Sequence, residues 1–250
     1  AATVAGQILA AIIAVIINLK KNPDIHIIPR EIRWNGVIAK EIYRVGFPSI
    51  VMQSISSIMT FGMNKILFGF TKTATAVFGA YFKLQSFVFM PIFGLNNGMV
   101  PIISYNYGAR RPERVKKTIR LAVCYAEGIM VLGFCIFEFF PGQVLGLFSA
   151  SQAMLTIGIP AMRIICLHFL LAGTSIVLSS VFQALGNGLF SLIVSVCRQL
   201  FVLLPAAWLL AQTGNVNNVW WAFLIAEIVS VLMSLAFYAH INKTIIVPLC

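Results

Sequence analysis

Long apolar runs separated by short polar segments set the pattern of this chain. Six of these runs exceed the roughly 20 residues that an α-helix needs to cross the hydrocarbon of a bilayer. Their approximate bounds are Tyr43–Phe70, Thr75–Tyr107, Val115–Phe140, Ala153–Leu185, Leu189–Ala211 and Val219–Ile241. The pattern predicts an all-α polytopic membrane protein, whose six-helix transmembrane bundle spans residues 43–250.

The segment before this bundle has two parts. Residues 1–19 are apolar from the start, without the basic leader of a signal peptide, so we expect the end of a transmembrane helix of a longer protein. Residues 20–42 are polar and predict a cytoplasmic linker. Within it, apolar residues at helical spacing after Pro29 predict a short amphipathic helix lying on the membrane; a plain solvated linker is the alternative. These residues are Trp34, Val37, Ile38, Ile42 and, just beyond, Val45.

Composition supports the membrane interpretation. Of the 250 residues, 60% are hydrophobic and 10% are charged, whereas a soluble domain has about 25% charged residues. The mean hydropathy is +0.93. The net charge of +11 sits mostly in two loops, so it predicts membrane orientation rather than binding to nucleic acid.

The basic residues predict that orientation. With residues 20–42 in the cytoplasm, the inside segments hold Lys20, Lys21, Arg30, Arg33, Lys40, Arg44, Arg110, Arg111, Arg114, Lys116, Lys117, Arg120 and Lys243. The outside ends hold only Lys65 and Lys72. This bias predicts a multi-pass protein of the cell membrane, inner or plasma, with a cytoplasmic C-terminus.

Polar residues follow one face of each of the first two long runs. On the first run they are Gln53, Ser56, Ser57, Thr60 and Asn64. The matching face of the second run carries Lys83, Phe87, Met90, Gly94, Asn97 and Pro101. Helix breakers between Met90 and Pro101 also predict an irregular helix there, which needs neighbours or water. We interpret Gln53, Ser56, Thr60, Lys83, Phe87, Met90 and Asn97 as candidate lining of a substrate cleft; the alternative is polar packing between helices.

Few charges fall inside the runs, and each needs a partner or water because charge is costly within a bilayer. The two acids well inside are Glu127 and Glu227. Either one binds a coupling proton or cation, or else it neutralises Arg163 or Arg198 as a structural pair.

No pattern of enzymatic chemistry appears. The five cysteines are scattered without metal or redox spacing, and the three histidines do not cluster. The sequence has no phosphate-binding glycine loop, zinc signature or nucleophile elbow. We therefore expect no catalytic residues, no metal site and no cofactor.

The run from Gly94 to Lys117, with its core at Pro101, Asn106, Tyr107, Gly108 and Ala109, resembles the end of the eighth helix in the multidrug and toxic compound extrusion (MATE) family. Weaker resemblances agree in order along the chain. They are Gly46, Phe47 and Pro48 at the start of a bundle, Phe182 to Gly188, Arg198 with Pro205, and Trp221 with Glu227.

The resemblance implies one lobe of a twelve-helix transporter, here the C-terminal one, with the N-terminal lobe as its missing partner. It also implies export of small amphiphilic or cationic substrates in exchange for Na⁺ or H⁺. Many family members carry acids near the positions of Ser56 and Ala172, and neither is acidic here. The resemblance therefore implies that the coupling-ion site lies in the missing lobe.

Two rival interpretations remain. A lipid-linked oligosaccharide flippase of the same superfamily is the first, and it predicts that Lys83, Arg163 and Arg198 converge on a cationic cavity. The second is a membrane scaffold without transport, or a lipid-modifying enzyme, which predicts His or acidic residues gathered at one membrane face.

Overall fold

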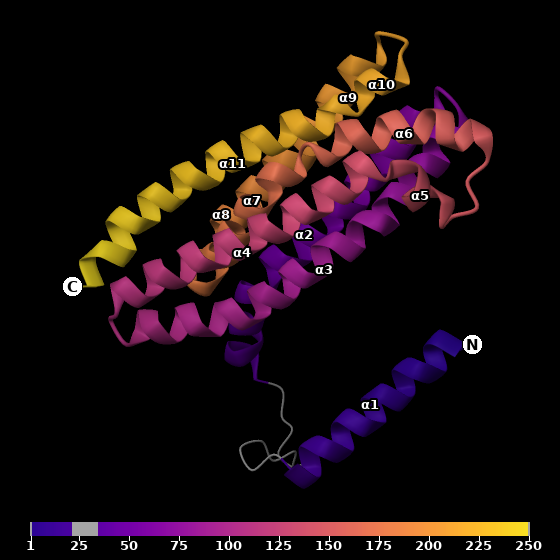
Figure 1. Cartoon of the computed structure of the whole chain (residues 1–250). Helices are drawn as coiled ribbons and strands as arrows, with labels where there is room; N and C mark the ends of the chain where they lie inside the picture. Colours follow the sequence, from indigo (N-terminus) through magenta and orange to yellow (C-terminus); the bar gives the residue numbers. More distant parts are fainter. Residues whose placement is uncertain (1, 22–34, 250) are drawn as a thin grey trace. The chain divides into compact units, whose positions relative to one another are not determined.

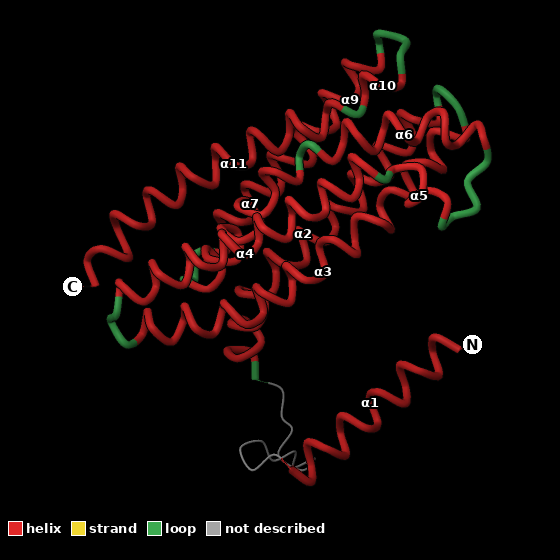
Figure 2. The backbone as a smooth tube through the Cα atoms, viewed as in Figure 1, coloured by secondary structure: helices red, strands yellow, loops and turns green. Residues whose placement is uncertain are grey.

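The structure, a computed structural model, describes residues 2–21 and 35–249 (Figure 1). Every regular element among these residues is a helix (Figure 2). The chain divides into two compact units, Ala1–Arg44 and Val45–Cys250.

The first unit holds α1 (Ala2–Lys21) and the start of α2 (Gly36–Phe68). Apolar side chains are exposed along α1, and a helix that is hydrophobic all round belongs in lipid or against another helix. Residues 22–34, with most of the expected linker, lie outside the described residues. Beyond them α2 starts at Gly36, where the Asn35 side chain accepts a hydrogen bond from the Val37 amide at 2.9 Å. Val37, Ile38 and Ile42 thus belong to the same continuous helix as the first expected span.

The second unit continues from α2 through a series of further helices. They are α3 (Lys72–Gly108), α4 (Pro112–Phe139), α5 (Pro141–Gly146), α6 (Gln152–Cys166), α7 (Phe169–Ala184), α8 (Gly188–Val196), the π-helix η2 (Cys197–Leu203), α9 (Leu204–Ala211), α10 (Val216–Val219), α11 (Trp221–Ile241), the π-helix η3 (Asn242–Ile246) and the 3₁₀-helix η4 (Val247–Leu249). The all-α prediction is confirmed.

The expected count of six spans is not exact. Four helices of the described chain are long and apolar enough to cross a membrane: 72–108, 112–139, 188–211 and 216–246. The expected span Ala153–Leu185 is instead the pair α6 and α7, bent by 52°, which makes a fifth crossing if the pair is one span. Helix α2 has the length but is not among them, because its polar residues lower its hydropathy.

The expected irregularity between Met90 and Pro101 is wrong, since α3 continues as a single helix through Pro91 and Pro101. Both prolines face outward and are exposed. The backbone carbonyls that lose a partner, those of Phe87 and Asn97, belong to exposed residues as well. The break in regular helix falls elsewhere, at the α6–α7 bend and in η2.

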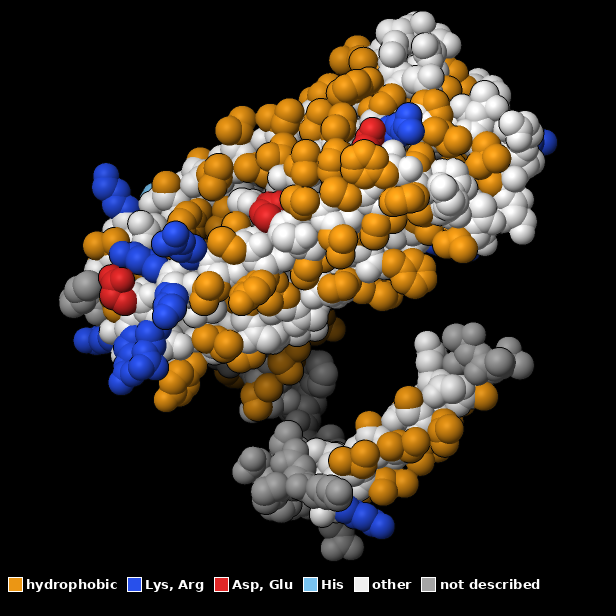
Figure 3. Space-filling model, in the orientation of Figure 1, with side chains coloured by type: hydrophobic (Ala, Val, Ile, Leu, Met, Phe, Trp, Pro, Cys, Tyr) orange, Lys and Arg blue, Asp and Glu red, His pale blue; other side chains and the backbone are white. Residues whose placement is uncertain are grey.

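The helices of the second unit lie side by side in an elongated bundle (Figures 1 and 2). Its centre is a set of buried aromatic rings in edge-to-face contact, including Tyr81 with Phe137 and Phe137 with Phe169. The α3–α4 turn, the α7–α8 turn and the end of α11 share one end of the bundle. Lys and Arg side chains gather at this end (Figure 3), whereas Lys65 and Lys72 flank the turn between α2 and α3.

Candidate functional site

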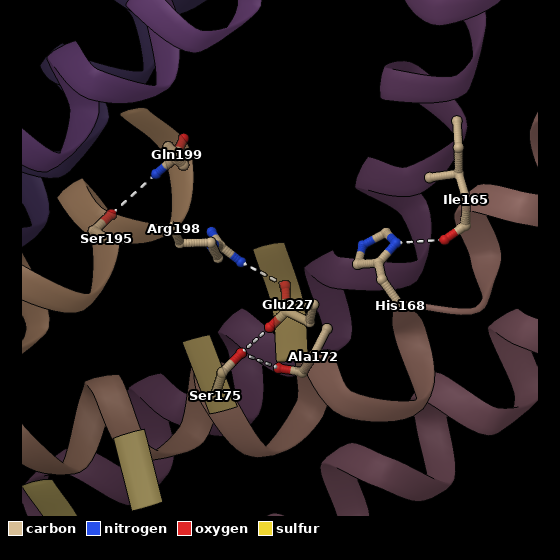
Figure 4. Close-up of polar contacts among 8 residues, drawn as sticks. All are labelled: Ile165, His168, Ala172, Ser175, Ser195, Arg198, Gln199 and Glu227. Carbon is tan, nitrogen blue, oxygen red and sulfur yellow. Dashed lines mark hydrogen bonds and ion pairs between the residues drawn. The ribbon is translucent and has the colours of Figure 1, made fainter. Parts of the chain in front are cut away.

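A buried ion pair joins the last two long helices inside the bundle (Figure 4). Arg198 of η2 donates through Nη1 to Oε2 of Glu227 in α11 at 3.0 Å. The hydroxyl of Ser175 in α7 donates to the other carboxylate oxygen of Glu227. The Glu227 side chain is 3% exposed and that of Arg198 is 31% exposed, so the acid is the deeply buried partner. The predicted structural pair is present for Glu227.

The π-helix η2 presents Arg198 to this acid. Pro205 follows directly in α9, and a proline lacks the N–H that would bond the carbonyl four residues earlier. A wider π turn before the proline relieves the clash of its ring with that carbonyl. π segments of this kind recur at functional sites because they redirect one side chain within an otherwise continuous helix.

Two hollows meet at Arg198. The larger, of about 210 Å³, lies among α3, α7, α8, η2 and α11. Five serines line it together with Gln183 and the rings of Phe89 and Phe93: Ser175, Ser179, Ser180, Ser195 and Ser230. The smaller, of about 60 Å³, is lined by residues that include Gln85, His168, Gln199 and Glu227. Arg198 lines both.

The larger hollow is polar enough to hold water. Ser230 is buried, and its hydroxyl has no hydrogen-bond partner among the described residues. Ser195 accepts a hydrogen bond from Gln199 Nε2 at 3.0 Å. A cavity with several hydroxyls and the free donors of a guanidinium provides the two to four partners that a buried water needs.

His168 lies at the bend between α6 and α7. Its Nδ1 is 2.5 Å from the backbone carbonyl oxygen of Ile165, and its ring packs against Phe89, Phe169 and Phe223. The bend thereby turns a histidine toward the smaller hollow.

The other intramembrane charges have separate partners. Glu127 of α4 accepts hydrogen bonds from the backbone N–H and the hydroxyl of Thr174, both at 2.6 Å. It forms no ion pair within the described part of the chain, so the predicted pairing with an arginine is absent for this acid. Arg163 lies 4.0 Å from Glu138 and donates to its backbone carbonyl at 3.3 Å.

The candidate cleft residues lie apart from this network, on the surface of the bundle. On α2, Gln53 is exposed, Ser56 and Thr60 are half-buried, and a shallow hollow of about 400 Å³ contains the last two. On α3, the exposed side chains are Lys83, Phe87, Met90 and Asn97. Their role as cleft lining stays a prediction.

The serine-lined hollow beside Arg198 was not predicted from the sequence. The signal was present as serines spaced by four residues: Ser175 and Ser179, Ser191 and Ser195, and Ser230 and Ser234. Each pair falls on one helical face, but the sequence alone does not show that these faces of α7, α8 and α11 lie next to one another.

A family model described as MatE matches residues 48–209, well over half of the chain. The chain belongs to the MatE family. Relatives include the multidrug export protein MepA of Staphylococcus saprophyticus, 26% identical over 233 residues, which are 93% of this chain and 51% of that protein. MepA of Staphylococcus aureus strain MRSA252 is 26% identical over 226 residues, 90% of this chain and 49% of that protein.

Solved structures agree with this MatE assignment. A MOP superfamily transporter from Pyrococcus furiosus shares the fold with a TM-score of 0.83 at 23% identity, over 93% of this chain and 53% of that one. An outward-facing multidrug resistance MATE family transporter matches with a TM-score of 0.80 at 25% identity, over 92% of this chain and 54% of that one. The chain spans about half the length of these MatE relatives. Family and helices together make it a multi-pass membrane protein.

Proposed function

We propose that this chain is one lobe, the C-terminal one, of a MATE-type efflux antiporter that exports small amphiphilic or cationic compounds from the cell. The observation that carries the proposal is the half-length match: 90–93% of the chain aligns with about half of proteins named as multidrug exporters. The partner is then the other lobe of the same protein.

The outer faces of α2 and α3 support a central cleft between two such lobes. Gln53, Lys83 and Asn97 are exposed on the bundle surface, within segments long enough to lie at membrane depth. Polar and charged groups there need water or protein partners rather than lipid. Phe87 and Met90 are 72% and 64% exposed on the same α3 face, and they supply the soft apolar surface that accommodates varied substrates.

Coupling to Na⁺ or H⁺ belongs to the other lobe in this proposal. The two acids well inside the described bundle already have strong partners: Glu227 has Arg198 and Ser175, and Glu127 has Thr174. The bundle end that carries the basic cluster and the end of α11 is proposed to face the cytoplasm, because positive charge is retained on that side.

The flippase alternative receives no support from the arrangement of charges. Arg163 is paired with Glu138, and Arg198 is paired with Glu227. Lys83 lies exposed on α3. These three cations therefore do not converge on one cavity for a pyrophosphate.

The test is drug accumulation in a transporter-deficient host that expresses the full-length protein. We expect wild type to lower accumulation of a cationic dye and Asn97→Ala to weaken this effect at equal membrane expression. The control is Gln143→Ala, which changes an exposed amide on the short α5 at one end of the bundle. If wild type leaves accumulation unchanged for a panel of cationic and neutral dyes, the efflux proposal fails.

A further inference from the structure

An apolar groove runs between α3 and α4 on the surface of the bundle. It has a volume of about 400 Å³. Its lining comes from Gly94, Leu95, Gly98, Met99 and Ile102 of α3 and from Thr118, Leu121, Ala122 and Tyr125 of α4. Two hydroxyl side chains line the groove, those of Thr118 and Tyr125. The Thr118 hydroxyl already donates a hydrogen bond to the backbone carbonyl of Arg114 at 2.8 Å. The groove lining is therefore almost entirely apolar. A site for a polar drug usually has several polar side chains that fix the orientation of the ligand.

Two glycines create the space. An added Cβ at Gly94 or Gly98 would meet no other atom within 4 Å. Leu121 and Tyr125 remain 45% and 64% exposed beside the groove. The groove is thus open along its length and shaped for a flexible apolar chain.

Basic side chains stand at one end of this groove. Arg114 lies four residues before Thr118, and Lys117 lies four residues before Leu121, so each sits on the groove side of α4. Side chains on a helix lean toward its N-terminus, which here is the bundle end where Lys and Arg gather (Figure 3). Neither Arg114 nor Lys117 has a carboxylate within 4.0 Å among the described residues; the nearby Glu113 pairs with Lys116.

We propose that this groove binds an anionic phospholipid, with an acyl chain along Gly94 and Gly98 and the phosphate at Arg114 and Lys117. The apolar groove would hold the acyl chain, and the basic side chains would hold the phosphate. In a bilayer the phosphate lies at the surface and the acyl chain lies deeper, which is the same order. Tyr105, 76% exposed one turn beyond Ile102, lies at the level where tyrosine rings favour the headgroup region. Gly94 belongs to the same α3 face as the candidate cleft residues, so the bound lipid would lie beside the proposed cleft.

The test is native mass spectrometry of the purified, delipidated full chain, titrated with dioleoyl phosphatidylglycerol or dioleoyl phosphatidylcholine. We expect tighter binding of phosphatidylglycerol. Arg114→Gln with Lys117→Gln should weaken it about thirtyfold, at roughly tenfold or less per basic residue. Lys65→Gln with Lys72→Gln is the charge-matched control at the opposite end and should leave the affinity unchanged.

A second pair of variants tests the groove itself. Gly98→Leu, or Gly94→Leu if the first does not fold, fills the space and should weaken phosphatidylglycerol binding. Gly79→Leu is the control, since Gly79 is an exposed glycine of α3, far along the helix from the groove, with no atom within 4 Å of an added Cβ. The proposal is overturned by equal affinity for the two lipids. It is overturned equally by unchanged affinity in the filled groove, the result expected if the other lobe or a substrate occupies this face.

Discussion

Arg198→Met removes the cationic partner of Glu227 and leaves a carboxylate that is 3% exposed without a counter-charge. Breaking a buried ion pair in this way costs about 3–5 kcal/mol. Because the Arg198 side chain is 31% exposed to the serine-lined hollow, water partly replaces it, and we expect about 3 kcal/mol. For a chain of this size, that corresponds to a fall of roughly 6–12 °C in melting temperature.

The reverse change should cost less. Glu227→Gln keeps an acceptor for the Ser175 hydroxyl and leaves Arg198 beside several hydroxyls and open space. We expect a loss of about 1.5 kcal/mol, the lower end of the range for a hydrogen bond to a charged group. The double variant should be more stable than Arg198→Met alone, because it no longer buries an unpaired charge.

The assay is thermal unfolding of the purified full chain in detergent, monitored by loss of the monodisperse peak in size-exclusion chromatography. Arg163→Met is the matched control: its 4.0 Å pair with Glu138 is 53% and 33% exposed and should contribute only about 0–1 kcal/mol. The reasoning is refuted if Glu227→Gln is the more damaging single change, or if Arg163→Met costs as much as Arg198→Met.

Two further changes test the contact between α4 and α7. Gly173→Ala places a Cβ 2.9 Å from Cδ of Glu127, so we expect a loss of about 1–3 kcal/mol in the same unfolding assay. Gly128→Ala, with open space in the interior of α4, should be neutral or slightly stabilising, and equal losses for the two changes would contradict the close approach. Thr174→Val keeps the backbone N–H but removes the hydroxyl that donates to Glu127 at 2.6 Å, which should cost about 1–2 kcal/mol. Thr118→Val, whose hydroxyl bonds only the carbonyl one turn earlier on the surface, should cost less, and a larger cost there would argue against the Glu127 contact.

The long helices could be predicted because their signals are local. The observed ends of α3 and α4 lie within about four residues of the ends of the expected runs. The length of each apolar run and the turn at residues 109–111 determine where these two helices begin and end. The prolines of α3 misled the prediction for the same reason: local propensity counts Pro91 as a breaker, whereas the folded helix places it on an exposed face.

The polar network could be predicted only in part. An acid and an arginine inside apolar runs implied a pair, and the structure joins Arg198 to Glu227 across 29 residues of sequence. Glu127 instead accepts hydrogen bonds from Thr174. This contact is possible because Gly173 has no side chain, so that α4 and α7 can approach closely there. The bend before His168 and the π turn at Arg198 were not predicted either, although Pro205 stands close after the π turn.

The central claim is that the exposed polar face of α3 lines a water-filled cleft rather than lipid. The direct measurement is labelling of Asn97→Cys by a membrane-impermeant maleimide, in the full-length protein with its native cysteines replaced. Leu232→Cys on α11, 63% exposed, serves as the lipid-facing control. The account predicts that Asn97→Cys is labelled, that a transported substrate slows the labelling, and that Leu232→Cys stays unlabelled. An Asn97→Cys variant as unreactive as Leu232→Cys would contradict it.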